Sequence, residues 1–186
     1  MRAALLLLAM AACSSRSTTV SPAPAPAAKL PASTAPSVYE LGITLRDSAD
    51  QRIGLDALRG GPVLLTMFYA SCAVACPAVI EDLRRTLAEA PPDVKVLLVS
   101  FDPARDTPAK LAELAAARGL DGRWTLAAAD DADVRELAAA IGYRYRKLET
   151  GEFFHGSTIV LLDAEGRPLA RTEGFNQREP LLEALR

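Results

Sequence analysis

The chain has 186 residues, 50% of them hydrophobic, and a formal net charge of −2. This composition supplies enough apolar material for one domain with a buried core, and we expect no second domain. Acidic and basic residues are interspersed, without the basic stripe of a nucleic-acid-binding protein, so the sequence predicts no nucleic-acid partner.

Residues 1–13 have the pattern of an export signal. Arg2 provides the positive start, residues 3–10 form an apolar run too short to span a bilayer, and two alanines precede Cys13. An apolar stretch that ends in Ala-Ala-Cys resembles the lipobox of bacterial lipoproteins, which implies that Cys13 carries a lipid anchor. An ordinary cleaved signal with a chance cysteine is the alternative. We therefore expect a periplasmic protein, lipid-anchored to a bacterial membrane.

Residues 14–37 are almost entirely Ser, Thr, Ala and Pro, a composition that cannot build a core. The segment is interpreted as a tether, which at about 3.1 Å per residue could hold the domain up to ~70 Å from the membrane. The folded domain is then expected to cover residues 38–186.

Strand and helix patterns alternate through this domain. The expected elements, in chain order, are a hairpin of residues 38–45 with the segment around Ile53, a strand at 63–69, a helix at 77–90, a strand at 94–100, a helix capped by Thr107, a strand at 124–127, a helix at 131–141, strands at 157–162 and 168–173, and a helix from Gln177. This order predicts an α/β fold with a mixed central sheet flanked by helices. It is the order of a thioredoxin-like fold with an added N-terminal β-hairpin.

Cys72 and Cys76 lie between the strand at 63–69 and the following helix, where open α/β sheets place their ligands. Their spacing is close to one helical turn, which puts both sulfurs on one side, and a helix N-terminus is expected to lower a thiol pKa. If Cys13 is lipidated, these two cysteines remain as a pair. The pair predicts either a redox-active dithiol, which needs a periplasmic thiol reductant, or a metal site. An inert disulfide is the alternative without a function in chemistry.

His155 is the single histidine of the chain and precedes the strand at 157–162. A lone histidine is often only a surface or core residue. In thioredoxin-like folds, however, the loop before this strand lies against the cysteine turn, and here Ser157 stands near the place of the cis-proline found in redox members. Two thiolates and one imidazole are a soft donor set that suits copper(I) better than zinc, and copper(II) could bind with an added oxygen ligand.

Asp102 and Asp106 follow the strand at 94–100. If their loop folds toward the cysteines, either carboxylate could serve as a fourth or outer-shell ligand. Formation of a turn around Pro103 and a cap at Thr107 is the alternative role for both.

Three motifs occur in a fixed order: Cys-x-x-x-Cys-Pro within residues 69–77, Asp-Pro-x-x-Asp-Thr within residues 100–108, and His155 before the strand that leads to Asp163. Gly-Phe-Asn at 174–176 follows them. Together these segments resemble the Sco/SenC family, copper-binding thioredoxin-fold proteins that assist the assembly of cytochrome c oxidase. The resemblance covers residues 38–186.

The resemblance implies that Cys72, Cys76 and His155 are copper ligands. It also implies a copper metallochaperone that receives the ion from a copper donor and serves the dinuclear copper centre of cytochrome c oxidase subunit II, or another cuproprotein. A thiol-disulfide oxidoreductase acting on the cysteines of a cuproprotein is the main alternative. A non-catalytic binding module stays open, whereas peroxidase activity is disfavoured because no threonine stands three residues before Cys76.

Overall fold

A computed structural model describes residues 35–72 and 75–186 of the chain. The predicted signal sequence with Cys13, and nearly all of the predicted tether, lie outside the described residues. Within the described part, no helix has both the length and the apolar character needed to cross a membrane.

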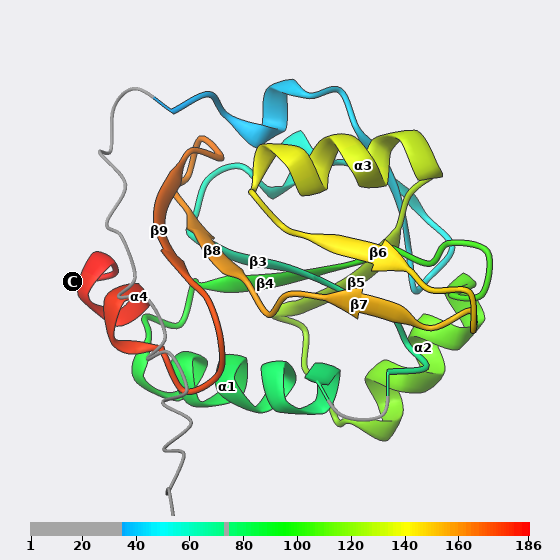
Figure 1. Cartoon of the computed structure of the whole chain (residues 1–186). Coiled ribbons are helices and arrows are strands. Elements are labelled where there is room, and N and C mark those ends of the chain that lie inside the picture. Colours follow the sequence, from blue (N-terminus) through cyan, green and yellow to red (C-terminus); the bar gives the residue numbers. More distant parts are fainter. Residues whose placement is uncertain (1–34, 73–74) are drawn as a thin grey trace, which may run out of the picture.

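The centre of the domain is a seven-stranded mixed sheet with the order β2-β1-β5-β4-β3-β8-β9 (Figure 1). The middle strands β3, β4 and β5 are parallel, and the others pair antiparallel to their neighbours. The strands are β1 (Thr44–Asp47), β2 (Arg52–Gly54), β3 (Val63–Phe68), β4 (Lys95–Ser100), β5 (Trp124–Ala128), β8 (Ile159–Leu162) and β9 (Pro168–Thr172). The predicted mixed sheet with an added N-terminal hairpin is confirmed.

Apolar runs decide which strands are central. All residues of β3 and β8 are buried, as expected for strands covered on both faces. Figure 1 shows α1 and α4 on one side of the strands and α3 on the other. The helices are α1 (Ala75–Glu89), α2 (Pro108–Ala117), α3 (Asp131–Ala140) and α4 (Glu179–Ala184), with 3-10 turns η1 (Val38–Glu40) and η2 (Leu55–Leu58).

Two local signals act as predicted, and one segment differs. The Thr107 hydroxyl accepts a hydrogen bond from the Lys110 amide and so caps α2, whose first residue is Pro108. The segment expected as a first strand at 38–45 instead forms η1, and the strand begins only at Thr44. The Ser37 hydroxyl accepts from the Tyr39 amide and starts that 3-10 turn, which explains the shorter strand.

A second, two-stranded sheet was not predicted. It consists of β6 (Tyr145–Lys147) and β7 (Phe153–His155), with Tyr145 opposite His155 in the register. Both strands have three residues, and β6, with the sequence Tyr-Arg-Lys, has no alternation of apolar and polar residues from which a strand could be identified. His155 is therefore the last residue of a hairpin strand rather than part of a simple loop before β8.

Candidate metal centre

The cysteine turn connects β3 to α1. The chain leaves β3 at Phe68, and the Cys72 amide donates to the Tyr69 carbonyl oxygen at 3.1 Å, which closes a tight turn. Cys76 lies in the first turn of α1, and its amide donates to the Cys72 sulfur at 3.3 Å. No disulfide joins the two residues. The predicted position at the exit of a central strand and the entry of a helix is confirmed, with Cys72 before α1 and Cys76 already inside it.

Cys76 is buried, with its sulfur 3.5 Å from the Tyr69 carbonyl oxygen. Burial raises the pKa of the Cys76 thiol because the apolar surroundings disfavour the thiolate, and the neighbouring Cys72 adds to the rise. The expectation of a lowered thiol pKa is therefore wrong for Cys76, because desolvation by burial is the largest effect on this thiol. A metal ion that binds this sulfur must displace its proton.

His155 reaches the cysteine turn from β7. Its Nε2 atom lies 3.7 Å from the Cys72 sulfur, and its Nδ1 atom lies 2.7 Å from the Gly156 carbonyl oxygen. A carbonyl oxygen only accepts hydrogen bonds, so in the neutral imidazole the proton lies on Nδ1 and the lone pair of Nε2 faces the sulfur. This is the tautomer that a metal ligand needs, and such second hydrogen bonds commonly orient metal-binding histidines.

The two sulfurs and one ring nitrogen all lie within 4.8 Å of one another. Donors that bind one ion at about 2.0–2.3 Å are roughly 3.5–4 Å apart, so the three atoms need to move by no more than about 1 Å to share an ion. Among residues 35–72 and 75–186, this is the one group of three or more Cys, His, Asp or Glu side chains with such spacing. The donor set therefore fits a soft metal ion.

An aromatic cluster surrounds the His155 ring, and the sequence reasoning did not identify it. The ring centroid of His155 lies 5.4 Å from Phe101 and 5.6 Å from Tyr69. Half of the ten Phe, Tyr and Trp residues of the chain belong to this cluster. Its members are Tyr69, Phe101, Tyr143, Tyr145 and Phe153. The sequence did carry a signal for this cluster, because aromatic residues are concentrated at 143–155 in a chain that is only 5% aromatic.

Tyr143 is the member whose hydroxyl lies within hydrogen-bond distance of the candidate ligand. Its hydroxyl lies 3.1 Å from His155 Nδ1 and donates to the Gly156 carbonyl oxygen at 2.7 Å. Burial raises the pKa of Tyr143, with the two nearby thiols adding to the rise, so the phenol stays protonated at neutral pH. The imidazole proton is thus shared between a carbonyl and a phenol oxygen, and both fix the ring.

The loop of Asp102 and Asp106 folds toward the cysteine turn, which was the condition for a ligand role. Asp106 is buried and accepts hydrogen bonds from the Ala70 amide at 2.8 Å and the Ser100 hydroxyl at 2.5 Å. The Asp102 carbonyl accepts from the Arg105 and Asp106 amides, which forms the alternative turn. Neither carboxylate belongs to the three-donor group. Asp106 therefore positions the backbone two residues before Cys72, and a ligand role for either stays a prediction.

Arg105 fastens the β6–β7 hairpin to the domain. Its guanidinium pairs with the buried Asp102, donates to the Gly151 carbonyl oxygen at 3.0 Å, and lies over the rings of Tyr69 and Phe153 at 5.9 and 5.8 Å. Cation–π contacts of this kind stabilise by about 0.5–1 kcal/mol each at exposed sites. Arg105 lies in the second sequence motif, but no local pattern assigned it this role.

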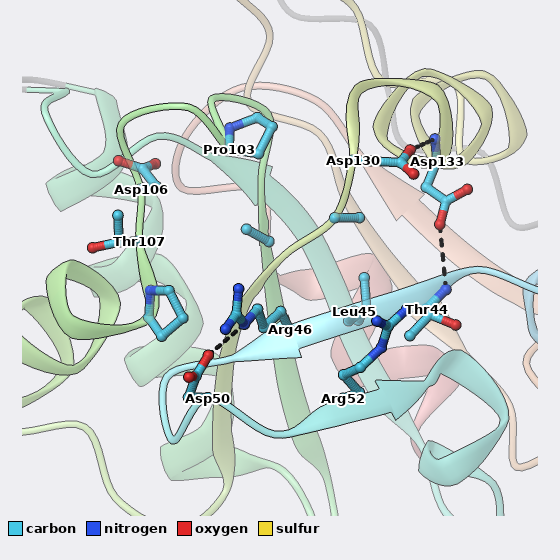
Figure 2. A pocket seen from close by; sticks show the side chains of 13 residues that line it. Thr44, Leu45, Arg46, Asp50, Arg52, Pro103, Asp106, Thr107, Asp130 and Asp133 are labelled. Carbon is cyan, nitrogen blue, oxygen red and sulfur yellow. Dashed lines mark hydrogen bonds and ion pairs between the residues drawn. The ribbon is translucent and has the colours of Figure 1, made fainter.

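A separate hollow of about 670 Å³ lies between the β1–β2 hairpin and the starts of α2 and α3 (Figure 2). Two of its charged groups have partners within the hollow: Arg46 pairs with Asp50, and Asp133 accepts from the Thr44 amide. Asp106 lines it, but none of the three candidate ligands does. This hollow is therefore distinct from the candidate metal centre.

A mixed sheet with a Cys-x-x-x-Cys turn at its centre, faced by a histidine, defines a thioredoxin-like protein with a candidate site for a soft metal ion. Residues 34–186 match the family model described as SCO1/SenC, and the chain belongs to this family. The family resemblance identified from the three motifs is thereby confirmed.

Sequence relatives agree with this assignment. The SCO1 protein homolog of Bacillus subtilis is 26% identical over 147 residues, which is 75% of this chain and 76% of that protein. A protein of Stutzerimonas stutzeri named for copper binding is 30% identical over 73 residues. That match spans 37% of this chain and only 36% of the relative.

Solved structures confirm the thioredoxin-like fold. A protein of Aquifex aeolicus is 27% identical with a TM-score of 0.70, and the match covers 87% of this chain and 93% of that chain. The ScoI protein of Bradyrhizobium japonicum, solved with copper bound, is 24% identical with a TM-score of 0.61. There the match covers 77% of this chain and 92% of the other.

Proposed function

We propose that this protein binds one copper ion through Cys72, Cys76 and His155 and delivers it to a cuproprotein. The observation that carries the proposal is the convergence of two sulfurs and the Nε2 atom within 4.8 Å, with Nδ1 held by Gly156 so that Nε2 is available to a metal. Membership in the SCO1/SenC family and the copper-bound ScoI relative support it.

The chemistry of the donors favours copper among the transition metals. Thiolate and imidazole are the ligands of copper(I), which is stable with three donors, whereas zinc usually takes four. Copper(II) would need an added oxygen donor, such as water. The rings of Tyr69 and Phe101 pack near His155, and apolar surroundings favour a singly charged ion over a doubly charged one.

The recipient that the family resemblance supports is cytochrome c oxidase subunit II, at its dinuclear copper centre. A copper donor would load the site, and a thiol reductant would keep Cys72 and Cys76 reduced. In this scheme the protein acts at the periplasmic face of a bacterial membrane, held by a lipid on Cys13.

Titration of the reduced protein with copper(I), in competition with a chromophoric chelator, tests the ligand set. We expect one tightly bound ion per chain. Replacing His155 with Ala should weaken binding by at least about 100-fold, since loss of an outer-shell partner alone costs about 10–100-fold. The control is Glu149→Ala, an exposed change in the same hairpin connection. Equal affinity in the His155→Ala and control proteins would contradict the three-ligand site.

A thiol-disulfide oxidoreductase is the second candidate, favoured by two thiols within one helical turn. In that reaction the Cys72 and Cys76 thiols form a disulfide. Their two electrons and two protons reduce a disulfide of the partner to two thiols. The partner's copper ligands would then be ready to accept the metal.

A deletion strain separates the two functions. Oxidase activity restored by added copper supports delivery of the ion. Activity restored by a small-molecule thiol reductant, but not by copper, supports the oxidoreductase. Full oxidase activity in the untreated deletion strain would contradict a role in oxidase assembly, and other cuproproteins would then be assayed.

A further inference from the structure

A groove of about 700 Å³ lies between α3 and the β6–β7 hairpin, next to the candidate metal centre. In Figure 1, α3 runs above these two strands. Four cationic side chains line the groove: Arg135, Arg144, Arg146 and Lys147. No Asp or Glu is among its described lining residues, although the chain as a whole is slightly acidic.

The four cations have no carboxylate partner within the described part of the chain. Among the residues described, eight other arginines and Lys110 are ion-paired, whereas Arg52, Arg59, Arg84, Arg118 and Lys95 are not. What distinguishes the four groove cations is that they gather in one hollow. Like charges gathered in a hollow repel one another and attract anions, so this arrangement costs stability unless an acidic group binds there. The groove therefore has the electrostatic character of a binding site for acidic groups.

The groove also has apolar lining residues. Ala138 and Tyr145 are among them, as is Phe154, which at 65% exposed is the most exposed large hydrophobic side chain among the described residues. An apolar patch with a charged rim is typical of protein interaction sites. A concave shape fits a segment of polypeptide better than the flat surface of a bilayer.

The groove is coupled to the metal centre by position. Tyr143 lines it, and the hydroxyl of the same residue contacts His155 Nδ1 at 3.1 Å. Phe154 immediately precedes His155 in β7, and Tyr145 lies opposite His155 in the register. A segment bound in the groove would thus lie beside the candidate ligand without covering Cys72.

We propose that this groove binds an acidic segment of a partner protein, in which an apolar side chain packs on Phe154 and Tyr145 while carboxylates face the four cations. Such docking would hold the partner's own metal ligands beside His155. The placement of the partner's metal ligands rests on the proposed copper function, whereas the binding of an acidic segment depends on the groove alone. Charge complementarity of this kind mainly raises the association rate and the specificity.

The test uses the full chain and a short fluorescein-labelled peptide in which Asp and Glu residues flank a central Phe. Fluorescence anisotropy should show binding that weakens as salt is added, and a peptide with Lys in place of the acidic residues should not bind. The double variant Arg144→Glu/Arg146→Glu should weaken binding at least about fivefold. Phe154→Ala should weaken it about threefold or more.

The matched control is Arg84→Glu/Arg186→Glu, which changes the net charge equally on α1 and beyond α4. Equal weakening in the control and groove variants would overturn the proposal, since binding would then depend on net charge only. Binding of the groove face to phosphatidylglycerol vesicles without binding of the peptide would also overturn it. Copper(I) affinity is measured in the same proteins. Absence of copper binding would refute the metal function, whereas the peptide measurement alone would decide whether the groove binds acidic segments.

Discussion

His155 is held on both sides of its ring. Nε2 faces the Cys72 sulfur at 3.7 Å, while Nδ1 contacts the Gly156 carbonyl oxygen and the Tyr143 hydroxyl. The sequence predicted the ligand type because the chain has one histidine in a suitable place. It could not predict which nitrogen faces the metal, because the tautomer depends on hydrogen bonds that form only in the folded protein.

Replacing Tyr143 with Phe tests this positioning. The change removes one of the two oxygens at Nδ1 and keeps the ring in the cluster, so we expect copper(I) affinity to fall about tenfold while His155 still binds. Competition titration measures the affinity, and resonances of the imidazole nitrogens report a change in hydrogen bonding that loss of stability alone would not cause.

Tyr145→Phe is the matched control for that change. The Tyr145 ring stacks on Phe101 in the same cluster, with 4.9 Å between the ring centroids. The hydroxyl that contacts His155, however, is that of Tyr143. Equal losses of affinity in the Tyr143 and Tyr145 variants would show that Tyr143 acts through packing and not through Nδ1.

At the scale of elements, the β6–β7 hairpin carries His155 to the site. Its packing depends on contacts from distant segments, including Phe101 after β4 and Tyr69 after β3. The Tyr69 hydroxyl also donates to the Glu152 carboxylate at 2.9 Å, next to β7. Local propensity in three-residue strands is too weak to reveal such an element, whereas α2 was predictable because Thr107 and Pro108 mark its start locally.

Replacing Arg105 with Ala should loosen the hairpin. The change removes the hydrogen bond to Gly151, two cation–π contacts and the partner of Asp102, which is 3% exposed. We expect a loss of about 1–3 kcal/mol in the free energy of unfolding and about tenfold faster amide exchange in residues 145–155. Urea denaturation and hydrogen-exchange mass spectrometry measure the two effects.

Arg123→Ala provides the comparison. Arg123 has a similar exposed fraction and also pairs with an aspartate, Asp121, but in the loop before β5. The hairpin should exchange normally in this variant. If hairpin exchange is the same in both variants, Arg105 does not hold the hairpin.

At the scale of the whole molecule, the buried strands and the helices between them were predictable from runs of apolar residues and their period. The predicted membrane attachment concerns residues outside the described part of the chain. This attachment depends on lipidation of Cys13. The signal-type sequence and the Ala-Ala pair before Cys13 predict that modification.

Expression of the full chain in a Gram-negative host with labelled palmitate tests the anchor. The protein should incorporate the label and sediment with membranes, whereas Cys13→Ala should lose the label and the membrane fraction because stable attachment requires the acyl chains. Ser14→Ala, at the adjacent position, should behave as the unchanged protein. Label retained in the Cys13 variant would refute lipidation at this cysteine.

The sequence by itself determined the sheet core, the cysteine turn and the kinds of candidate ligand, because apolar periodicity, helix caps and motif spacing are local properties. Only the tertiary structure decided that His155 meets Cys72 across 83 residues, that a hairpin delivers it, and that Cys76 is buried rather than activated. The physical reason is that distances, desolvation and the choice of tautomer arise from packing between segments that are far apart in the chain.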